Sequence, residues 1–293
     1  MMILLERLPT DAYRSNEPLS YQDVNNLHPL FDKIGFRSHV ILVGPKGIAK
    51  TLSVAAWARK QNVPLITFDC SEDVRRGHLY GHYITRGDDT PFVLGPITTA
   101  FEIANEVGEC VLALEEINAL TPQMQKTLNS ATDWRRRIEL PEAGKVFELG
   151  PGKRLWVVGT MNTSVYGGVY ELNEDLKSRF RMLKLGYPNP EDEKKIIACE
   201  FPTWNLPDLT VGTKKMSIPE GVLRLAHETR QEAMEYALST RDVVQILEDT
   251  MLCGLNNALW MCMGKFEGTD TTTLQKRMKA VFGDKILGAR SAG

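Results

Sequence analysis

Hydrophobic and polar positions alternate between two patterns along the first two thirds of the chain. Short apolar runs rich in β-branched residues, typical of strands buried on both faces, stand at 39–43, 64–68, 110–114 and 155–158. Apolar residues at helical spacing lie between them, at 50–60, 97–107 and 122–134. Strands that alternate with helices predict an α/β fold with a parallel sheet covered by helices on both faces.

The pattern changes near Pro188-Asn189-Pro190, where the strand signals end. Three later segments show helical spacing and no further buried strand, namely 218–237, 240–259 and 271–282. We therefore predict a domain boundary at about residue 187. Residues 1–187 would form the α/β domain, with an N-terminal extension at 1–38, and residues 188–293 a smaller all-helical domain.

Composition limits the classes of protein to consider. The 293 residues are 43% apolar, and 35 Lys and Arg against 37 Asp and Glu give a net charge of −2. This is an ordinary globular composition without the broad positive field of a nucleic-acid-binding protein. No apolar run approaches the roughly 18 residues of a membrane span, and the N-terminus lacks a signal-peptide layout. We expect a cytoplasmic protein without a membrane partner, its five scattered cysteines reduced.

The clearest local motif is a loop between the first predicted strand and the following helix. Its residues are Gly44, Pro45, Lys46, Gly47, Ile48, Ala49, Lys50 and Thr51. Such a loop turns successive backbone N–H groups toward one point, where they cradle phosphates at a helix N-terminus. Lys50 would reach the β and γ phosphates, and the Thr51 hydroxyl would bind Mg²⁺. The motif predicts a bound nucleoside triphosphate with Mg²⁺, and the choice between ATP and GTP stays open at this point.

Ala49 departs from this motif, which has glycine before the lysine. Alanine resists positive φ and brings a methyl group toward the phosphates. The substitution is therefore expected to weaken nucleotide binding to some degree.

Two glutamates follow the apolar run 110–114. At the carboxyl end of a strand, where open α/β sheets bind their ligands, Glu115 would hold Mg²⁺ and Glu116 would polarise the attacking water. Aspartate is usual at the first position, so the longer Glu115 could alter metal geometry or slow turnover. Asn162, after the run 155–158, is a neutral amide that could orient the water or contact the γ-phosphate.

These motifs occur in one order along the chain and are followed by Leu176-Lys177-Ser178-Arg179-Phe180-Arg181. The set resembles an AAA+ ATPase. Phe92-Val93-Leu94-Gly95-Pro96-Ile97-Thr98 and Leu185-Gly186-Tyr187-Pro188 narrow the resemblance to the MoxR branch and its CbbQ, NorQ and CobS-type relatives. It covers residues 36–247.

The resemblance implies roles for arginines outside the loop. Arg179 would be the finger that reaches the γ-phosphate of a neighbouring subunit, with Arg181 as the competing candidate. Arg241, in Ser239-Thr240-Arg241, would contact the nucleotide of its own subunit from the helical domain. The implied assembly is a ring of identical subunits, a homohexamer, that couples ATP hydrolysis to remodelling or activation of a partner protein.

Two further segments predict β-hairpins. Residues 77–92 contain a Gly-Asp turn between β-prone flanks, and 137–140 and 145–149 flank a Pro-Glu-Ala-Gly turn. The resemblance implies that both hairpins face the axis of the ring, where a client would bind. His78 and His82 are four residues apart, but no acid or cysteine completes a metal site around them.

Two other functions remain open. The related McrB-like branch suggests a motor or loader acting on DNA, with Arg75-Arg76 and Arg135-Arg136-Arg137 on the phosphate backbone. The near-zero net charge favours instead that these arginines pair with acids such as Glu72, Glu139 and Glu142 at contacts between subunits. Ala49 and Glu115 together would also fit a nucleotide-gated scaffold with little turnover.

Overall fold

The computed structural model describes residues 5–14, 19–162, 169–202, 209–211, 214–232, 234, 236–284 and 286–287. These residues form two compact units. The first holds the described part of 1–19 together with Asn25–Pro45 and Lys50–Leu185. The second holds the described part of Gly186–Gly293 together with Ser20–Val24 and Lys46–Ala49. No helix within the described ranges is both long enough and apolar enough to span a membrane.

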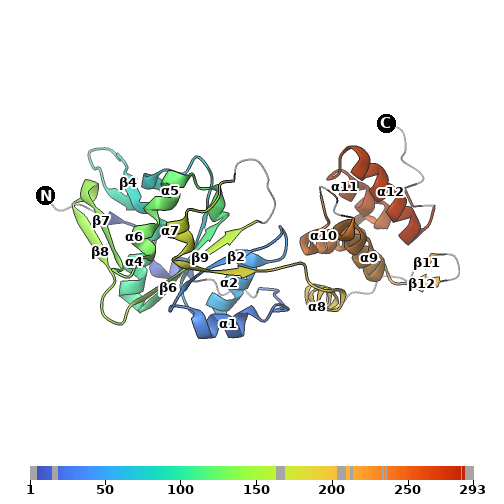
Figure 1. The fold of residues 1–293 in the computed structure, drawn as a ribbon, viewed down its shortest axis with the longest axis horizontal. Coiled ribbons are helices and arrows are strands. Elements are labelled where there is room, and N and C mark those ends of the chain that lie inside the picture. Colours follow the sequence, from blue (N-terminus) through green and yellow to red (C-terminus); the bar gives the residue numbers. More distant parts are fainter. Residues whose placement is uncertain are drawn as a thin grey trace. The chain divides into compact units, whose positions relative to one another are not determined.

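A five-stranded parallel sheet is the centre of the first unit (Figure 1). Its strands in spatial order are β10 (Phe180–Lys184), β2 (His39–Val43), β9 (Arg154–Met161), β6 (Glu109–Glu115) and β3 (Leu65–Asp69). Every neighbouring pair is parallel, so the carboxyl ends of all five strands lie at one edge. The predicted α/β class with a parallel sheet is confirmed.

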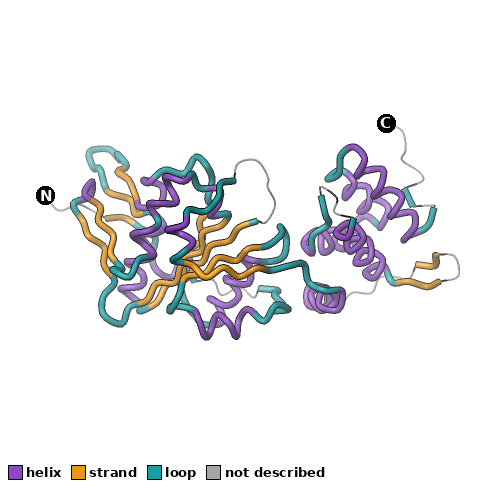
Figure 2. Tube along the Cα trace, in the orientation of Figure 1, coloured by secondary structure: helices purple, strands orange, loops and turns teal. Residues whose placement is uncertain are grey.

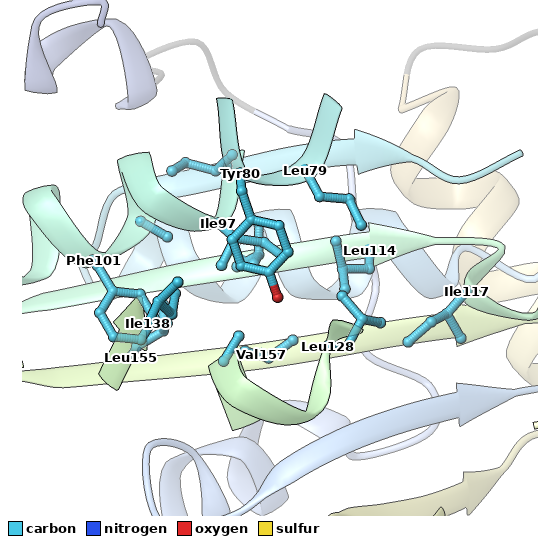
Figure 3. Packing of buried hydrophobic residues seen from close by; sticks show 14 of the residues in the cluster. Leu79, Tyr80, Ile97, Phe101, Leu114, Ile117, Leu128, Ile138, Leu155 and Val157 are labelled. Carbon is cyan, nitrogen blue, oxygen red and sulfur yellow. The ribbon is translucent and has the colours of Figure 1, made fainter. Parts of the chain in front are cut away.

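Apolar side chains from alternate strand positions build a separate core on each face of the sheet. Ile41 and Val43 belong to the larger cluster, shown in part in Figure 3, which also contains Tyr80, Phe101 and Leu114. Val40 and Leu42 point the other way, into a cluster with Trp57 and Trp156. Continuous apolar runs are needed here because both faces are buried.

Helices cover both faces of this sheet (Figure 1). Their bounds, with those of the short 3₁₀ turns, are η1 (Thr10–Tyr13), α1 (Leu27–Ile34), α2 (Lys50–Lys60), α3 (Arg76–Tyr80), α4 (Pro96–Val107), η2 (Ile117–Ala119), α5 (Pro122–Thr127), α6 (Asn129–Thr132), η3 (Pro141–Ala143) and α7 (Glu174–Lys177). The sequence analysis missed α1, and the single helix predicted at 122–134 is divided into α5 and α6 at Leu128.

Both predicted hairpins are confirmed. β4 (Gly81–Tyr83) pairs antiparallel with β5 (Phe92–Leu94), and β7 (Arg137–Leu140) with β8 (Lys145–Glu148). An unpredicted strand, β1 (Leu5–Glu6), adds in parallel to the outer edge of β5. The N-terminal segment therefore completes a three-stranded sheet with the first hairpin.

The second unit is mainly helical (Figure 2). Its elements are α8 (Pro190–Glu200), the strand pair β11 (Leu209–Val211) and β12 (Lys214–Met216), α9 (Ile218–Gln231), α10 (Thr240–Cys253), α11 (Leu255–Met263) and α12 (Gly268–Phe282). The continuous helix predicted at 240–259 is wrong. Gly254, at a φ of 84°, ends α10 and lets the chain turn before α11.

Candidate functional site

The phosphate-loop motif lies between β2 and α2, at the carboxyl edge of the sheet. It begins at Gly44, whose N–H donates to the carbonyl of Met161 at the end of β9 (3.2 Å). Gly47 and Ala49 both have positive φ, of 73° and 61°. Ala49 therefore adopts the left-handed conformation that the motif's usual glycine adopts without strain.

Lys50, the first residue of α2, turns its ammonium group back into this loop. Its Nζ donates to the carbonyls of Gly44 (2.8 Å) and Pro45 (2.7 Å) and to Oδ1 of Asn162 (3.0 Å). The lysine is 9% exposed, so its charge is largely removed from bulk water. Anionic oxygens that entered the loop would offer this charge stronger partners than neutral carbonyls do.

Thr51 and Glu115 form the second contact of the site. The Thr51 hydroxyl donates to Oε2 of Glu115 over 2.8 Å, although 64 residues separate them in sequence. Glu115 is the last residue of β6, and Thr51 lies in the first turn of α2. A hydroxyl and a carboxylate oxygen this close are donors of the kind that Mg²⁺ prefers. The donor chemistry therefore fits the predicted Mg²⁺ site.

Glu116 and Asn162 complete the set. Glu116 is exposed and has a left-handed backbone (φ 51°, ψ 47°), and its N–H donates to Oγ1 of Thr160 (3.2 Å). Nδ2 of Asn162 donates to Oε1 of Glu116 over 3.0 Å. Because Asn162 also accepts from Lys50, its amide links the loop lysine to the second glutamate. Thr160 is a member of this site that the sequence analysis missed, although Gly-Thr-Met-Asn contains it.

Strand order explains why these residues meet. β9 lies between β2 and β6, so the ends of three neighbouring strands carry the loop, Asn162 and the two glutamates. The structure thus brings together five predicted site residues, namely Lys50, Thr51, Glu115, Glu116 and Asn162.

Arg179 and Arg181 lie toward the opposite ends of the strands, where the amino ends of the parallel strands meet. Phe180 begins β10 and pairs with His39 at the amino end of β2, whereas the loop follows Val43 at the carboxyl end. Both arginines line a cleft of about 460 Å³, whose other members include Arg37, Asp133 and Trp134. The structure therefore separates the two finger candidates from Lys50 of the same chain.

This cleft was not predicted from the sequence. Nε of Arg179 is buried and has no hydrogen-bond partner among the described residues. Hydrogen bonds from Arg135 hold the pKa of the neighbouring Asp133 below its usual value. The Trp134 side chain is 86% exposed, which is unusual for tryptophan. The available signal in the sequence was Trp134 directly before Arg135-Arg136-Arg137.

Arg241 is in the first turn of α10, in the second unit. Its backbone N–H donates to the carbonyl of Gly47, a residue of the same unit (3.2 Å). Its neighbours Ser239 and Asp242 form a reciprocal capping box at the start of this helix. The exposed Arg241 side chain therefore projects from a well-fixed helix N-terminus.

Comparison with known proteins agrees with this geometry. Residues 39–180 match the family model of the AAA domain, dynein-related subfamily. The chain is 30% identical to protein CbbQ of Hydrogenophilus thermoluteolus over 56% of its length, and to protein NorQ of Paracoccus denitrificans over 55%. It is also 30% identical to the chaperone MoxR1 of Mycobacterium tuberculosis, over 55% of this chain and 40% of that protein. The matched regions span 59% of CbbQ and 57% of NorQ.

The parallel sheet, the phosphate loop and this family match together define a P-loop ATPase of the AAA+ class. Nucleotide binding is a general property of that class. Within it, the chain is similar to members of the MoxR branch, namely CbbQ, NorQ and MoxR1.

Proposed function

We propose that this protein is a Mg²⁺-dependent ATPase that assembles into a ring, a homohexamer, and uses ATP hydrolysis to remodel or activate a partner protein. One observation carries the proposal. Lys50, Thr51, Glu115 and Asn162 lie at the carboxyl ends of the strands, whereas Arg179 lies near the amino ends. A complete site then requires two copies of the chain.

Each residue of the set would have a distinct role. Backbone N–H groups of residues 46–49 and the Lys50 ammonium would hold the phosphates. Thr51 and Glu115 would hold Mg²⁺, which offsets phosphate charge when bound. Glu116 would accept a proton from the attacking water, and Asn162 would orient that water or the γ-phosphate. Residues 1–187 would serve as the nucleotide-binding domain and residues 188–293 as the lid that carries Arg241.

Arg179 would act on the nucleotide of the adjacent subunit. The five residues of β2 span about 16 Å along the sheet, farther than one arginine side chain extends. Nε of Arg179 is buried and has no hydrogen-bond partner among the described residues, so this donor is available for a phosphate oxygen of the adjacent subunit. Hydrolysis would therefore depend on ring formation, because Arg179 stabilises charge that develops in the transition state.

The ion pairs of the basic clusters favour a protein client over DNA. Arg135 pairs with Asp133 (2.7 Å), Arg137 with Glu139 (3.1 Å) and Arg76 with Glu142 (2.5 Å). Arginines already paired with carboxylates release fewer counterions on meeting a phosphate backbone. The similarity to MoxR1, which is named a chaperone, supports the same choice.

Mixing two inactive variants tests the shared site. Glu116→Gln and Arg179→Ala should each lower the hydrolysis rate of the assembled protein at least about 100-fold. In randomly mixed rings, one interface in four would combine an intact Glu116 with an intact Arg179. The mixture should therefore recover about a quarter of the wild-type rate.

The outcomes separate the parts of the proposal. Loss of turnover in Arg179→Ala but not in Arg181→Ala, with recovery when Arg179→Ala is mixed with Glu116→Gln, would assign the finger to Arg179, and the reverse would assign it to Arg181. Wild-type turnover by Glu116→Gln would refute the proposed chemistry. Tight ATP binding without turnover by the wild-type ring would indicate a scaffold instead.

A further inference from the structure

A buried ionic cluster in the second unit has no part in the proposed chemistry. At its centre is Glu193 on α8, whose side chain is 0% exposed. Arg230 on α9 donates to both carboxylate oxygens (3.0 and 2.9 Å), and the Thr240 hydroxyl donates to Oε1 (2.7 Å). Nε2 of His227 lies 3.5 Å from Oε2. A buried carboxylate is tolerated when it is paired and hydrogen-bonded in this way.

Arg230 connects three separate parts of the unit. Besides Glu193, it donates from Nε to the carbonyl of Leu238 (2.7 Å). Its guanidinium carbon lies 4.2 Å from the ring centre of Tyr187, the second residue after the chain enters this unit at Gly186. Only a planar guanidinium group can form the bidentate pair with Glu193, donate a third hydrogen bond to Leu238 and stack on the Tyr187 ring at the same time. Lysine could keep the charge but not this geometry.

The segment held by Arg230 leads directly to Arg241. The N–H of Leu238 donates to the Thr229 hydroxyl (3.1 Å), so both backbone groups of Leu238 are fixed by α9. Thr240 is tied to Glu193 two positions later. The residue immediately before Arg241 and the residue three before it are therefore anchored to a buried cluster, while Arg241 itself is exposed.

A second set of contacts fixes the segment from its other side. Oδ2 of Asp242 accepts from the N–H (2.8 Å) and the hydroxyl (2.6 Å) of Ser239. Its Oδ1 accepts from Tyr236 (3.0 Å) and Lys265 (2.5 Å). Residues on both sides of Arg241 are thus held by buried polar contacts, which leaves the direction of its backbone little freedom.

We propose that Glu193 and Arg230 are positioning residues, which aim Arg241 at the nucleotide and connect it to the start of the second unit at Tyr187. Neither touches the nucleotide, and both act through the 238–241 segment. The inference rests on the proposed role of Arg241 as a nucleotide contact. It adds Glu193 and Arg230 as residues on which that contact depends. It also gives a connected set of contacts through which a change at Arg241 can alter the position of Tyr187.

A double-mutant cycle on the assembled full-length protein tests this inference. Arg230→Lys should raise the KM for ATP about fivefold to tenfold, with a smaller change in kcat. Arg241→Ala should raise it at least as much. Because Arg230 acts through Arg241, Arg230→Lys should add less than about twofold in the Arg241→Ala background. Amide hydrogen exchange at 238–242 should also be faster in Arg230→Lys.

Arg224→Lys is the matched control, because Arg224 is on the same helix and forms an exposed pair with Glu228 (3.0 Å). It should leave the KM unchanged. Glu193→Gln, which keeps the size of the side chain, replaces Arg230→Lys in the cycle if that variant does not fold.

The possible results are distinct. A raised KM in Arg241→Ala with additive or absent effects of Arg230→Lys would overturn the inference and leave the proposed role of Arg241 in place. An unchanged KM in Arg241→Ala would refute that role, and the inference would fall with it. The same changes in KM with Glu193→Gln as are expected for Arg230→Lys would support the inference.

Discussion

The candidate nucleotide site and the Glu193 cluster use similar side chains in opposite ways. Both contain a carboxylate, a basic side chain and a threonine hydroxyl, each of which forms hydrogen bonds shorter than about 3.2 Å. At the nucleotide site, Glu116 is exposed, and Lys50 is bonded to neutral loop carbonyls. In the Glu193 cluster the carboxylate is fully buried and faces an arginine of its own chain.

This difference indicates which contacts can be exchanged. The lysine at the loop gains by replacing the carbonyls of Gly44 and Pro45 with phosphate oxygens, because those carbonyls carry no net charge. The Glu193 carboxylate has no better partner available, and separating it from Arg230 would leave a buried charge. The first arrangement suits a ligand site, and the second suits a fixed support.

Removing one carboxylate from each region should show the largest contrast. Glu193→Ala should destabilise the second unit by about 3–5 kcal/mol, because it leaves Arg230 buried without its anion. Glu115→Ala should cost the first unit less than about 1 kcal/mol, since Glu115 is only half-buried. It should instead weaken Mg²⁺-dependent ATP binding.

Hydrogen exchange of α8 and α10 peptides, and urea unfolding followed for each unit, would measure both stabilities. ATP titration with and without Mg²⁺ would measure binding. Equal losses of stability in the two variants would contradict the proposed difference between a ligand site and a support.

A pH titration addresses a buried group of the first unit that belongs to neither region. Burial lowers the pKa of His39 from 6.5 to about 4, and its Nδ1 accepts the Val157 N–H (3.1 Å) in the neutral form. The unfolded chain gains this proton near pH 6.5, but the folded protein gains it only near pH 4. The contribution of His39 to stability is therefore complete above pH 6.5 and declines by about 1.4 kcal/mol per pH unit toward pH 4.

His39→Asn keeps an acceptor for the Val157 N–H but does not titrate. Denaturant unfolding of the first unit between pH 7 and pH 4 should therefore show a flatter pH dependence than the wild type, by up to about 3 kcal/mol. His82→Asn, at an exposed hairpin position, is the control and should keep the wild-type curve. Parallel curves for wild type and His39→Asn would contradict the proposed contribution of His39 to the pH dependence of stability.

The smallest expected effect concerns the backbone of the phosphate loop. Ala49 adopts a φ of 61°, which glycine reaches without the steric cost of a Cβ atom. Ala49→Gly should therefore improve ATP binding by up to about fivefold, equivalent to about 1 kcal/mol of relieved strain. Isothermal titration with ATP and Mg²⁺ measures the change.

Ala55→Gly, in the middle of α2, is the matched control because the same substitution meets a helical backbone there. It should destabilise the first unit by about 1 kcal/mol without improving ATP affinity. If Ala49→Gly binds ATP more weakly than the wild type, the strain argument fails and the Ala49 methyl group has a useful contact.

Much of the fold was predictable because its signals are local. The β-branched residues of a run such as 39–43 are enough to identify a strand buried on both faces. The loop is identified by Gly44, Gly47 and Lys50, which follow that run. Interruptions were less predictable. The left-handed Gly254 divides α10 from α11, and an isolated glycine in a helical pattern can also be tolerated without a break.

By itself the sequence determined the α/β class, the phosphate loop and the order of the glutamate and asparagine motifs, since each depends on neighbouring residues. Only the tertiary structure decided which of these residues meet. Asn162 joins Lys50 and Glu116, 112 and 46 residues away, because β9 lies between β2 and β6. Arg230 likewise meets Glu193 across 37 residues. Such pairings follow from strand order and helix packing, which depend on the whole core rather than on any local pattern.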